Sequence, residues 1–245
     1  MRSNRGFSLI EMAFVLVIIT LLLGGLLVPF ATQVEQRRIA ETQKAMEEIK
    51  EALLGFAVAN GRLPCPDTTV AGVNANDGRE DPPVGGPCAV LEGNLPWVTL
   101  GVSNSDAWGN RFRYRVTDFF ATPGKITLGP PPTLGMLRVC STSGCGAGTI
   151  IADTIPAVVI SHGKNGYGAV NSNITAGTTG TNIAPTSPDE LANTDNNNDF
   201  VSRTITTAST PCGGAGQPLC EFDDLVVWLS PNILFNRMVA AGKLP

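Results

Sequence analysis

The chain has 245 residues, of which 43% are hydrophobic and 16% are charged, a composition typical of globular rather than disordered proteins. Its 17 Lys and Arg residues against 21 Asp and Glu residues give a net charge of −4, which argues against a general nucleic-acid-binding surface. The sequence contains no phosphate-binding glycine loop, dinucleotide fingerprint or nucleophile elbow, so none of these motifs indicates an enzyme.

Residues 1–31 combine a charged leader with a long apolar segment. Arg2 and Arg5 precede Gly6, and the run from Met12 to Ala31 contains no charged residue. As a helix this run would be about 30 Å long, which is enough to cross a bilayer. A secretory signal peptide has its cleavage site after the apolar run, but here the small residue lies before it. Cleavage after Gly6 would therefore remove the leader and keep the apolar segment.

The stretch Gly6–Glu11, with the sequence GFSLIE, resembles the class III signal of type IV pilins and of the pseudopilins of type II secretion systems. The resemblance implies cleavage after Gly6 by the prepilin peptidase and N-methylation of Phe7. It also implies a role for Glu11 in assembly, because a carboxylate in a membrane span needs a partner, such as the free amino group of Phe7 on a neighbouring subunit. The alternative is that Glu11 reaches the headgroups of an ordinary membrane anchor.

Pro29 is the second residue to which the resemblance gives a role in assembly. In pilins a proline near this depth accompanies local melting of the helix when subunits enter the filament, and Pro29 lies close to that position. Gly24 and Gly25 would weaken the same part of the helix. The alternative is a kink without functional consequence.

The charges and cysteines predict the compartment. Arg2 and Arg5 precede the apolar run, so by the positive-inside rule the N-terminus stays in the cytoplasm and the rest is exported to the periplasm or cell surface. The chain has six cysteines, which pair in such an oxidising space. Sequence proximity suggests Cys65–Cys88, Cys140–Cys145 and Cys212–Cys220, but other pairings stay open.

Residues 33–60 are expected to continue the helix with an amphipathic pattern. The apolar residues spaced to share one helix face are Ile39, Met46, Ile49, Leu53 and Phe56. The opposite face is charged, and Lys44–Glu48 and Glu47–Lys50 are spaced for ion pairing. Asn60-Gly61 would end the helix. We expect one helix over residues 7–60, broken or bent near its middle, with its second half packed on the head domain.

Residues 61–245 are expected to form a head domain built on an antiparallel sheet. The alternation over Phe112–Val116 predicts a strand with one buried face, while Arg111, Arg113 and Arg115 lie on the other face. Other expected strands are 97–100, 136–139, 155–160, 200–206 and 221–229. A short helix is expected after Ser230-Pro231.

The arginine row admits two interpretations. It could bind an anionic polymer such as DNA, but more often such a row is the solvated face of an antiparallel sheet, which we favour. The preceding turn, Asp106–Asn110, together with the strand looks like the start of the head sheet in major pseudopilins.

The loop Ser161–Gly166 resembles the pseudopilin loop that holds a calcium ion together with downstream carboxylates. Downstream, the candidate calcium ligands at alternate positions are Asp195, Asn197 and Asp199. The competing interpretation, which the composition favours, is a polar surface loop. Asp223-Asp224 would add ligands if the fold brought them near, although paired acids at a strand start are usually solvated.

His162, the only histidine, is not in a zinc-ligand or Ser-His-Asp pattern and is expected to be a loop or strand-end residue. The sequence therefore provides no constellation for catalysis, and no cofactor is expected apart from the calcium ion considered above. The residues point instead to a structural protein.

Together these features predict an α+β protein of the pilin fold. Its parts would be a leader (1–6), a membrane-spanning assembly half of the helix (7–31), an amphipathic half (32–60) and the head (61–245). The resemblance implies a structural subunit of a type IV pilus or pseudopilus, with other pilins, the prepilin peptidase and the inner-membrane assembly platform as partners. Two alternatives stay open: a minor tip pilin that binds a surface or DNA, and a membrane-anchored secreted enzyme that shares only the export signal.

Overall fold

The computed structural model describes residues 8–68, 76–81, 87–127, 129, 136–146, 148–174, 180–206 and 221–244, without the side chains of 22–29. The chain divides into two compact units, Met1–Ala40 and Glu41–Pro245. The helices are α1 (Leu9–Asn60), α2 (Trp97–Leu100), α3 (Asp118–Ala121), α4 (Pro188–Ala192) and α5 (Pro231–Ala240). The strands are β1 (Glu92–Asn94), β2 (Arg113–Val116), β3 (Leu137–Cys140), β4 (Ile150–Ile155), β5 (Ala157–Ser161), β6 (Asp199–Val201) and β7 (Leu225–Trp228).

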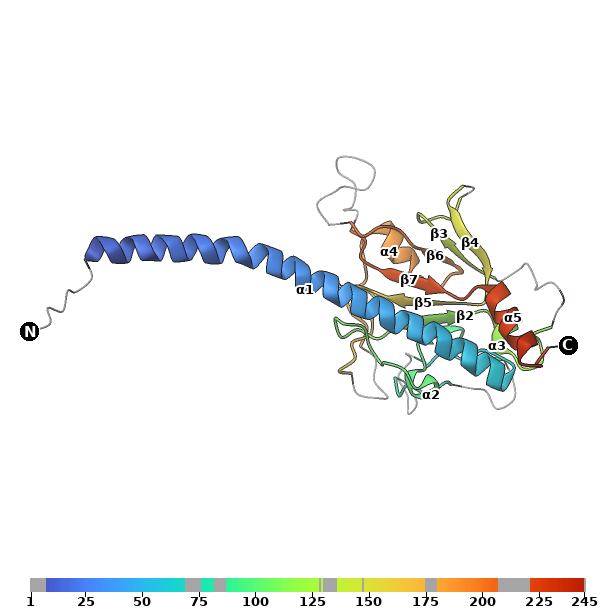
Figure 1. Cartoon of the computed structure of the whole chain (residues 1–245). Coiled ribbons are helices and arrows are strands. Elements are labelled where there is room, and N and C mark those ends of the chain that lie inside the picture. The colour runs from blue at the N-terminus through green and yellow to red at the C-terminus, as the bar shows by residue number, and fades with distance from the viewer. Residues whose placement is uncertain are drawn as a thin grey trace, which may run out of the picture. The chain divides into compact units, whose positions relative to one another are not determined.

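Two sheets are present among the described residues of the second unit. The larger sheet has the strand order β1-β2-β5-β7 and is antiparallel throughout. The smaller sheet has the order β4-β3-β6, in which β3 pairs antiparallel with β4 and parallel with β6. Figure 1 shows the neighbouring strands β2, β5 and β7 behind the second half of α1. The predicted α+β fold with a long helix and an antiparallel sheet is confirmed, whereas the parallel β3–β6 pair was not predicted.

Strand β5 forms the centre of the second unit because both of its faces are buried. Ala157 and Val159 belong to the main core cluster on the α1 side of the sheet. Val158 and Ile160 belong to a second cluster, formed with the smaller sheet. Alternate residues of a strand point to opposite faces, so a continuous apolar run such as β5 suits a strand covered on both sides.

The second half of α1 is anchored in this core by its apolar face. Met46, Ile49 and Leu53 are completely buried, and they belong to the same cluster as Tyr114 and Val116 of β2. Complete burial of such aliphatic side chains contributes roughly 1.5–3 kcal/mol each. The predicted packing of the amphipathic face is therefore confirmed for the part of α1 that lies in the second unit.

The charged face of α1 forms the expected ion pairs. Lys50 Nζ lies 2.9 Å from Glu47 Oε2, and Lys44 Nζ lies 3.8 Å from Glu48 Oε1. Glu47, Lys44 and Glu48 are more than half exposed, so these pairs contribute little to stability.

In the first unit, α1 continues through Gly24, Gly25 and Pro29 without interruption. The helix is therefore not broken there, and the alternative of a bend stays a prediction. Large apolar side chains are exposed here, among them Leu9 at 90% and Phe30 at 67%. Within the part of the chain that the structure describes, none of the helices has the length and apolar character needed to span a bilayer. The membrane-spanning segment 7–31 and the role of Pro29 stay predictions.

Two of the expected disulfides are present. Cys65 and Cys88 are bonded with their Cα atoms 5.5 Å apart, and Cys140 and Cys145 with theirs 5.4 Å apart. Both half-cystines of the first bond lie in the main core cluster. The expected Cys212–Cys220 pair lies outside the described residues.

The strand expected at 97–100 is wrong, because these residues form the short helix α2. Gly101 follows it in the left-handed region, at φ 69°, and its N–H bonds to the Trp97 carbonyl. This conformation favours glycine and ends a helical turn. The Trp97 ring also stacks under the Arg111 guanidinium, whose carbon lies 3.9 Å from the ring centroid.

The single strand expected at 155–160 is two strands that belong to different sheets. Pro156 separates them and has no N–H to donate to a ladder. β4 before it pairs with β3, whereas β5 after it pairs with β2 and β7. The strands expected at 200–206 and 221–229 are also shorter, as β6 and β7. The predicted C-terminal helix is confirmed as α5, with Leu234 and Met238 buried.

Candidate functional site

The processing segment is described only from Ser8 onward, so Gly6 and Phe7 lie outside the described residues. The Ser8 N–H donates to Glu11 Oε2 at 2.8 Å, and the Glu11 N–H donates to Ser8 Oγ at 3.3 Å. This reciprocal pair is a capping box, which satisfies free N–H groups at a helix start. Glu11 thus lies in the first turn of α1, a role that the sequence analysis did not assign to it.

The arginines of β2 are not a solvated face. Glu92 of β1 is 7% exposed, and it accepts hydrogen bonds from Arg113 Nε at 2.5 Å and Arg115 Nη1 at 2.7 Å. Arg113 also donates to the Thr194 carbonyl at 3.1 Å, and Arg115 donates to Asn198 Oδ1 at 2.8 Å. The turn at 194–198 therefore covers this side of β2.

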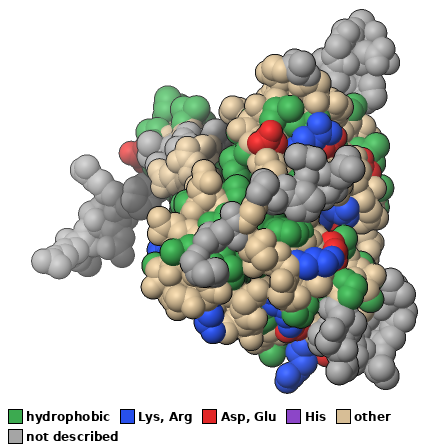
Figure 2. All heavy atoms as spheres, turned by 90° about the vertical axis from the view of Figure 1, so that its right-hand side faces the viewer, with side chains coloured by type: hydrophobic (Ala, Val, Ile, Leu, Met, Phe, Trp, Pro, Cys, Tyr) green, Lys and Arg blue, Asp and Glu red, His purple; other side chains and the backbone are tan. Residues whose placement is uncertain are grey.

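The expectation of a wet arginine face was wrong because two segments distant in sequence lie against it. Arg111 is 5% exposed, and Arg113 and Arg115 share the Glu92 carboxylate. Figure 2 shows one face of the molecule, on which Lys and Arg are scattered among polar and acidic side chains and form no broad basic patch. The arginine row is thus largely covered by other parts of the head.

Three carboxylates converge where α4 meets the start of β7. One oxygen each from Glu190, Asp223 and Asp224 lies within 4.8 Å of the other two. Glu190 is 1% exposed and Asp224 is 3% exposed. Glu190 Oε1 accepts from Asn165 Nδ2 and from the Asp223 N–H, both at 3.1 Å. Glu190 Oε2 and Asp223 Oδ1 are buried without a hydrogen-bond partner among the described residues.

The loop Ser161–Gly166 packs tightly against this carboxylate cluster of Glu190, Asp223 and Asp224. The Asn165 N–H donates to Asp223 Oδ2 at 2.8 Å. Gly163 has φ 56°, and a Cβ there would lie 2.3 Å from the Asp223 carbonyl oxygen, so only glycine fits. The loop and the acids are therefore brought together as one structural unit.

Burial and mutual repulsion change the acidity of this cluster. The pKa of Glu190 is raised to about 8, mainly by burial and secondly by the negative charge of Asp224. Burial raises the pKa of Asp223 to about 6, against the lowering effect of the hydrogen bond from the Asn165 N–H. Buried carboxylates with unpaired oxygens are costly unless they are protonated or bind a cation. This donor set of oxygens suits a hard cation such as Ca²⁺.

The calcium ligands suggested by the sequence alone lie in a different arrangement. Asp195 and Asn197 are exposed and bond to each other, with Asn197 Nδ2 donating to Asp195 Oδ2 at 2.6 Å. The Asp199 carboxylate accepts two hydrogen bonds from Arg138, each at 2.7 Å. These three residues therefore already have partners within the protein. The expectation that Asp223-Asp224 are solvated was wrong for Asp224, which is buried.

His162 lies directly after β5, as expected, but it is also 99% buried. Its Nδ1 lies 3.3 Å from Asp224 Oδ1, and its Nε2 has no hydrogen-bond partner among the described residues. The other oxygen of Asp224 accepts from Asn193 Nδ2 at 2.7 Å. His162 thus separates the carboxylate cluster from a neighbouring cavity.

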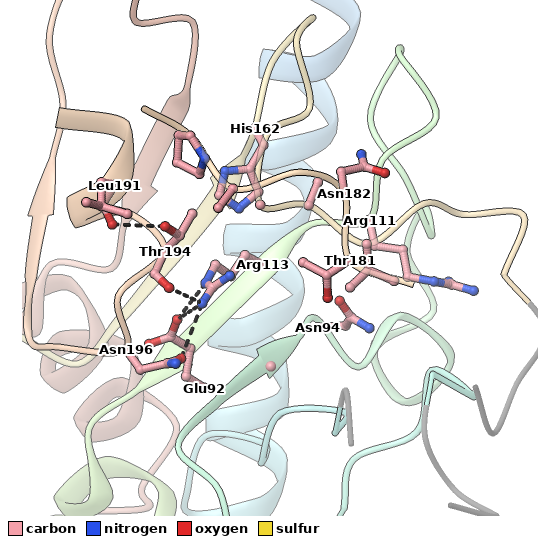
Figure 3. Close-up of a pocket in the computed structure, with 16 residues that line it drawn as sticks. Glu92, Asn94, Arg111, Arg113, His162, Thr181, Asn182, Leu191, Thr194 and Asn196 are labelled. Atoms are coloured by element: carbon pink, nitrogen blue, oxygen red, sulfur yellow. Dashed lines mark hydrogen bonds and ion pairs between the residues drawn. The ribbon is translucent and has the colours of Figure 1, made fainter. Parts of the chain in front are cut away.

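That cavity has a volume of about 360 Å³. Figure 3 shows its lining, with Glu92, Arg113, Thr194 and Asn196 joined on one side and His162 at another. Asn94, Thr181 and Asn182 add uncharged polar groups to the wall. The lining comes from β1, β2 and the loops that follow β5 and α4.

Comparison with known proteins identifies only the N-terminus. Residues 1–27 match a family described as the prokaryotic N-terminal methylation motif. No curated protein and no solved structure matches the chain. The match covers the leader, the proposed cleavage and methylation positions and Glu11, and it does not extend to the cavity or the carboxylate cluster.

Proposed function

We propose that this chain, which carries the class III prepilin signal of type IV pilins and pseudopilins in residues 1–27, is a structural subunit of a type IV pilus or pseudopilus. The signal supports membership of the pilin or pseudopilin family. In this proposal the prepilin peptidase cleaves after Gly6 and methylates Phe7. The subunit then leaves the inner membrane, through the assembly platform, for a filament made with other pilins.

The exposed apolar surface of α1 supports assembly through the helix. Leu9, Leu16 and Leu21 are each more than 60% exposed. Exposed apolar surface of this extent requires an apolar environment, such as lipid before assembly and neighbouring helices afterwards. The described residues of the head present no catalytic triad, and we propose no enzymatic activity.

Replacement of Gly6 by leucine tests this function. We expect the Gly6→Leu variant to remain a full-length precursor, because the peptidase of this family cuts after a small residue. Electrophoresis of the membrane fraction would then show a single species larger than the wild-type chain, and no variant in sheared filaments. The matched control is Ser3→Leu, a similar change within the leader, which should be processed. Normal processing of Gly6→Leu would contradict the proposal.

We also propose that Glu190, Asp223 and Asp224 hold a calcium ion in the head. The unpaired buried oxygens of Glu190 and Asp223 support this, because a cation would compensate their charge. The ion would fix α4, the start of β7 and the adjoining loop in one arrangement. Its role would be structural, as expected for a subunit that is exported and then packed into a filament.

The raised pKa values determine how stability changes with pH when calcium is removed. An acid whose pKa is raised by folding binds more protons in the folded state than in the unfolded state. Its contribution to stability therefore falls as the pH rises from its ordinary pKa to its raised pKa. The interval runs from 4.5 to about 8 for the pKa of Glu190, and from 3.8 to about 6 for Asp223. Asp67, with its pKa raised to about 7 by burial, acts in the same direction.

In EDTA we therefore expect the free energy of unfolding to fall by roughly 3 kcal/mol between about pH 5 and about pH 8. Calcium at about 1 mM should restore the part of this loss that comes from Glu190 and Asp223, but not the part that comes from Asp67. Thermal unfolding of the full chain in detergent, followed by tryptophan fluorescence, measures both effects. Glu190→Gln should abolish the response to calcium, whereas Asp195→Asn should retain it. The reverse pattern would place the ion at Asp195, Asn197 and Asp199 instead.

A further inference from the structure

We infer that the cavity beside His162 binds a neutral monosaccharide unit, a function beyond that of a filament subunit. Small-molecule sites range from about 300 to 1,000 Å³. The volume here is about 360 Å³, which suits a ligand of one sugar ring. The cavity is open to one side of the head, so a terminal sugar of a longer glycan could enter it.

The walls of the cavity are fixed before any ligand arrives. Arg113 links β1 to the 194–196 turn, because it bonds to Glu92 and also donates to the Thr194 carbonyl and to Asn196 Oδ1. On the opposite wall, Asn182 Nδ2 donates to the Gly166 carbonyl at 2.9 Å. Side chains held in this way lose little freedom when a ligand binds, so preorganisation favours affinity.

His162 provides an unsatisfied hydrogen-bonding group on the cavity wall. It is 1% exposed, and its Nε2 is buried without a partner among the described residues. The Nδ1 of His162 lies 3.3 Å from Asp224 Oδ1, and Nε2 is an acceptor or a donor according to the tautomer of the ring. A hydroxyl group can both donate and accept, so it suits Nε2 in either case. The unpaired nitrogen therefore points to a ligand rich in hydroxyl groups.

The charges around the cavity favour a neutral ligand. Arg113 shares the Glu92 carboxylate with Arg115. Arg113 also donates to the Thr194 carbonyl and to Asn196 Oδ1, so its guanidinium is already held by partners within the protein. Figure 3 shows the Arg111 side chain directed away from the Arg113 side chain, and its guanidinium stacks on Trp97. Behind His162 lies the negative Asp224. A ligand with a net charge would be attracted at one wall and repelled at another, whereas hydroxyl groups suit the amide, carboxylate and guanidinium groups alike.

The test is binding of single sugars to the full chain in a detergent without a sugar headgroup. Saturation-transfer NMR and calorimetry would use glucose, galactose, N-acetylglucosamine and N-acetylgalactosamine, with glycine and glucuronate as zwitterionic and anionic probes. We expect at least one neutral sugar to bind with a dissociation constant on the order of 1 mM. Because the unassembled chain is used, the result does not depend on whether filaments form.

Two neighbouring substitutions locate the binding. Ala184 is an exposed residue of the cavity wall, and Ala184→Trp should fill the entrance and weaken binding at least about tenfold. Ile183 is 79% exposed and does not line the cavity, so Ile183→Trp should bind as the wild type does. Unfolding midpoints verify that both variants fold. Absence of binding by all four sugars, unchanged binding by Ala184→Trp, or preferential binding of glycine or glucuronate would overturn the inference.

Discussion

Replacing Glu92 with alanine is expected to lower the free energy of unfolding of the head by about 3 kcal/mol. Glu92 has a side chain 4% exposed and is the shared partner of Arg113 and Arg115. Its removal leaves two largely buried guanidinium groups close together without a counter-charge. The loss lies at the lower end of the range for broken buried pairs, because Arg113 and Arg115 keep bonds to Thr194 and Asn198.

Urea or thermal unfolding of the full chain in detergent measures this effect, and the midpoint should fall by about 6–12 °C. The matched control is Glu48→Ala, which breaks an exposed pair with Lys44 and should change the free energy of unfolding by less than about 1 kcal/mol. A Glu92→Ala variant as stable as the control would mean that the three-residue network does not hold β1 to β2.

Replacing Glu11 with leucine is expected to block assembly while leaving processing intact. In the proposed filament, the Phe7 amino group of a neighbouring subunit would then lie in an apolar environment without a counter-charge. Breaking a buried charge pair costs about 3–5 kcal/mol, which corresponds to at least about a hundredfold loss of incorporation. Quantitative immunoblotting of sheared filaments against the membrane fraction measures this ratio.

Ser8→Ala separates the two possible roles of Glu11. This variant removes the hydroxyl of the capping box, at a cost of about 1 kcal/mol to the helix start, but keeps the carboxylate. We expect it to be processed and to assemble within about tenfold of the wild type. Incorporation of Glu11→Leu into filaments at the wild-type level would contradict the charge-pairing role. An equal loss of incorporation in Glu11→Leu and Ser8→Ala would assign the defect to the helix cap.

The sequence was most informative where the pattern was local. The spacing of Met46, Ile49 and Leu53 predicts the buried face of α1, and the alternation of Tyr114 and Val116 predicts the buried face of β2. The GFSLIE stretch predicts the processing signal that the family comparison supports. Each of these features depends on neighbouring residues and on a known period, so no tertiary information is needed to find it.

The site residues that were missed depend on contacts between distant segments. Glu92 stands in a short strand with no alternation, and nothing near it indicates that it will face Arg113 and Arg115. Glu190 of α4 was not named as a ligand, and Asp224, which precedes β7, was named only on the condition that the fold brought it near. Only the fold brings the two carboxylates together. Burial of charged groups in this way overrides the general rule that acidic pairs and arginine rows are solvated. Pro156 was the one local signal that would have divided β4 from β5.

The central claim, that this chain is a processed filament subunit, is tested most directly by mass spectrometry of protein recovered from a sheared-filament fraction. The account predicts a mature chain that begins with N-methylated Phe7 and is abundant in that fraction. An unprocessed chain that keeps Met1 and remains in the membrane fraction would contradict it.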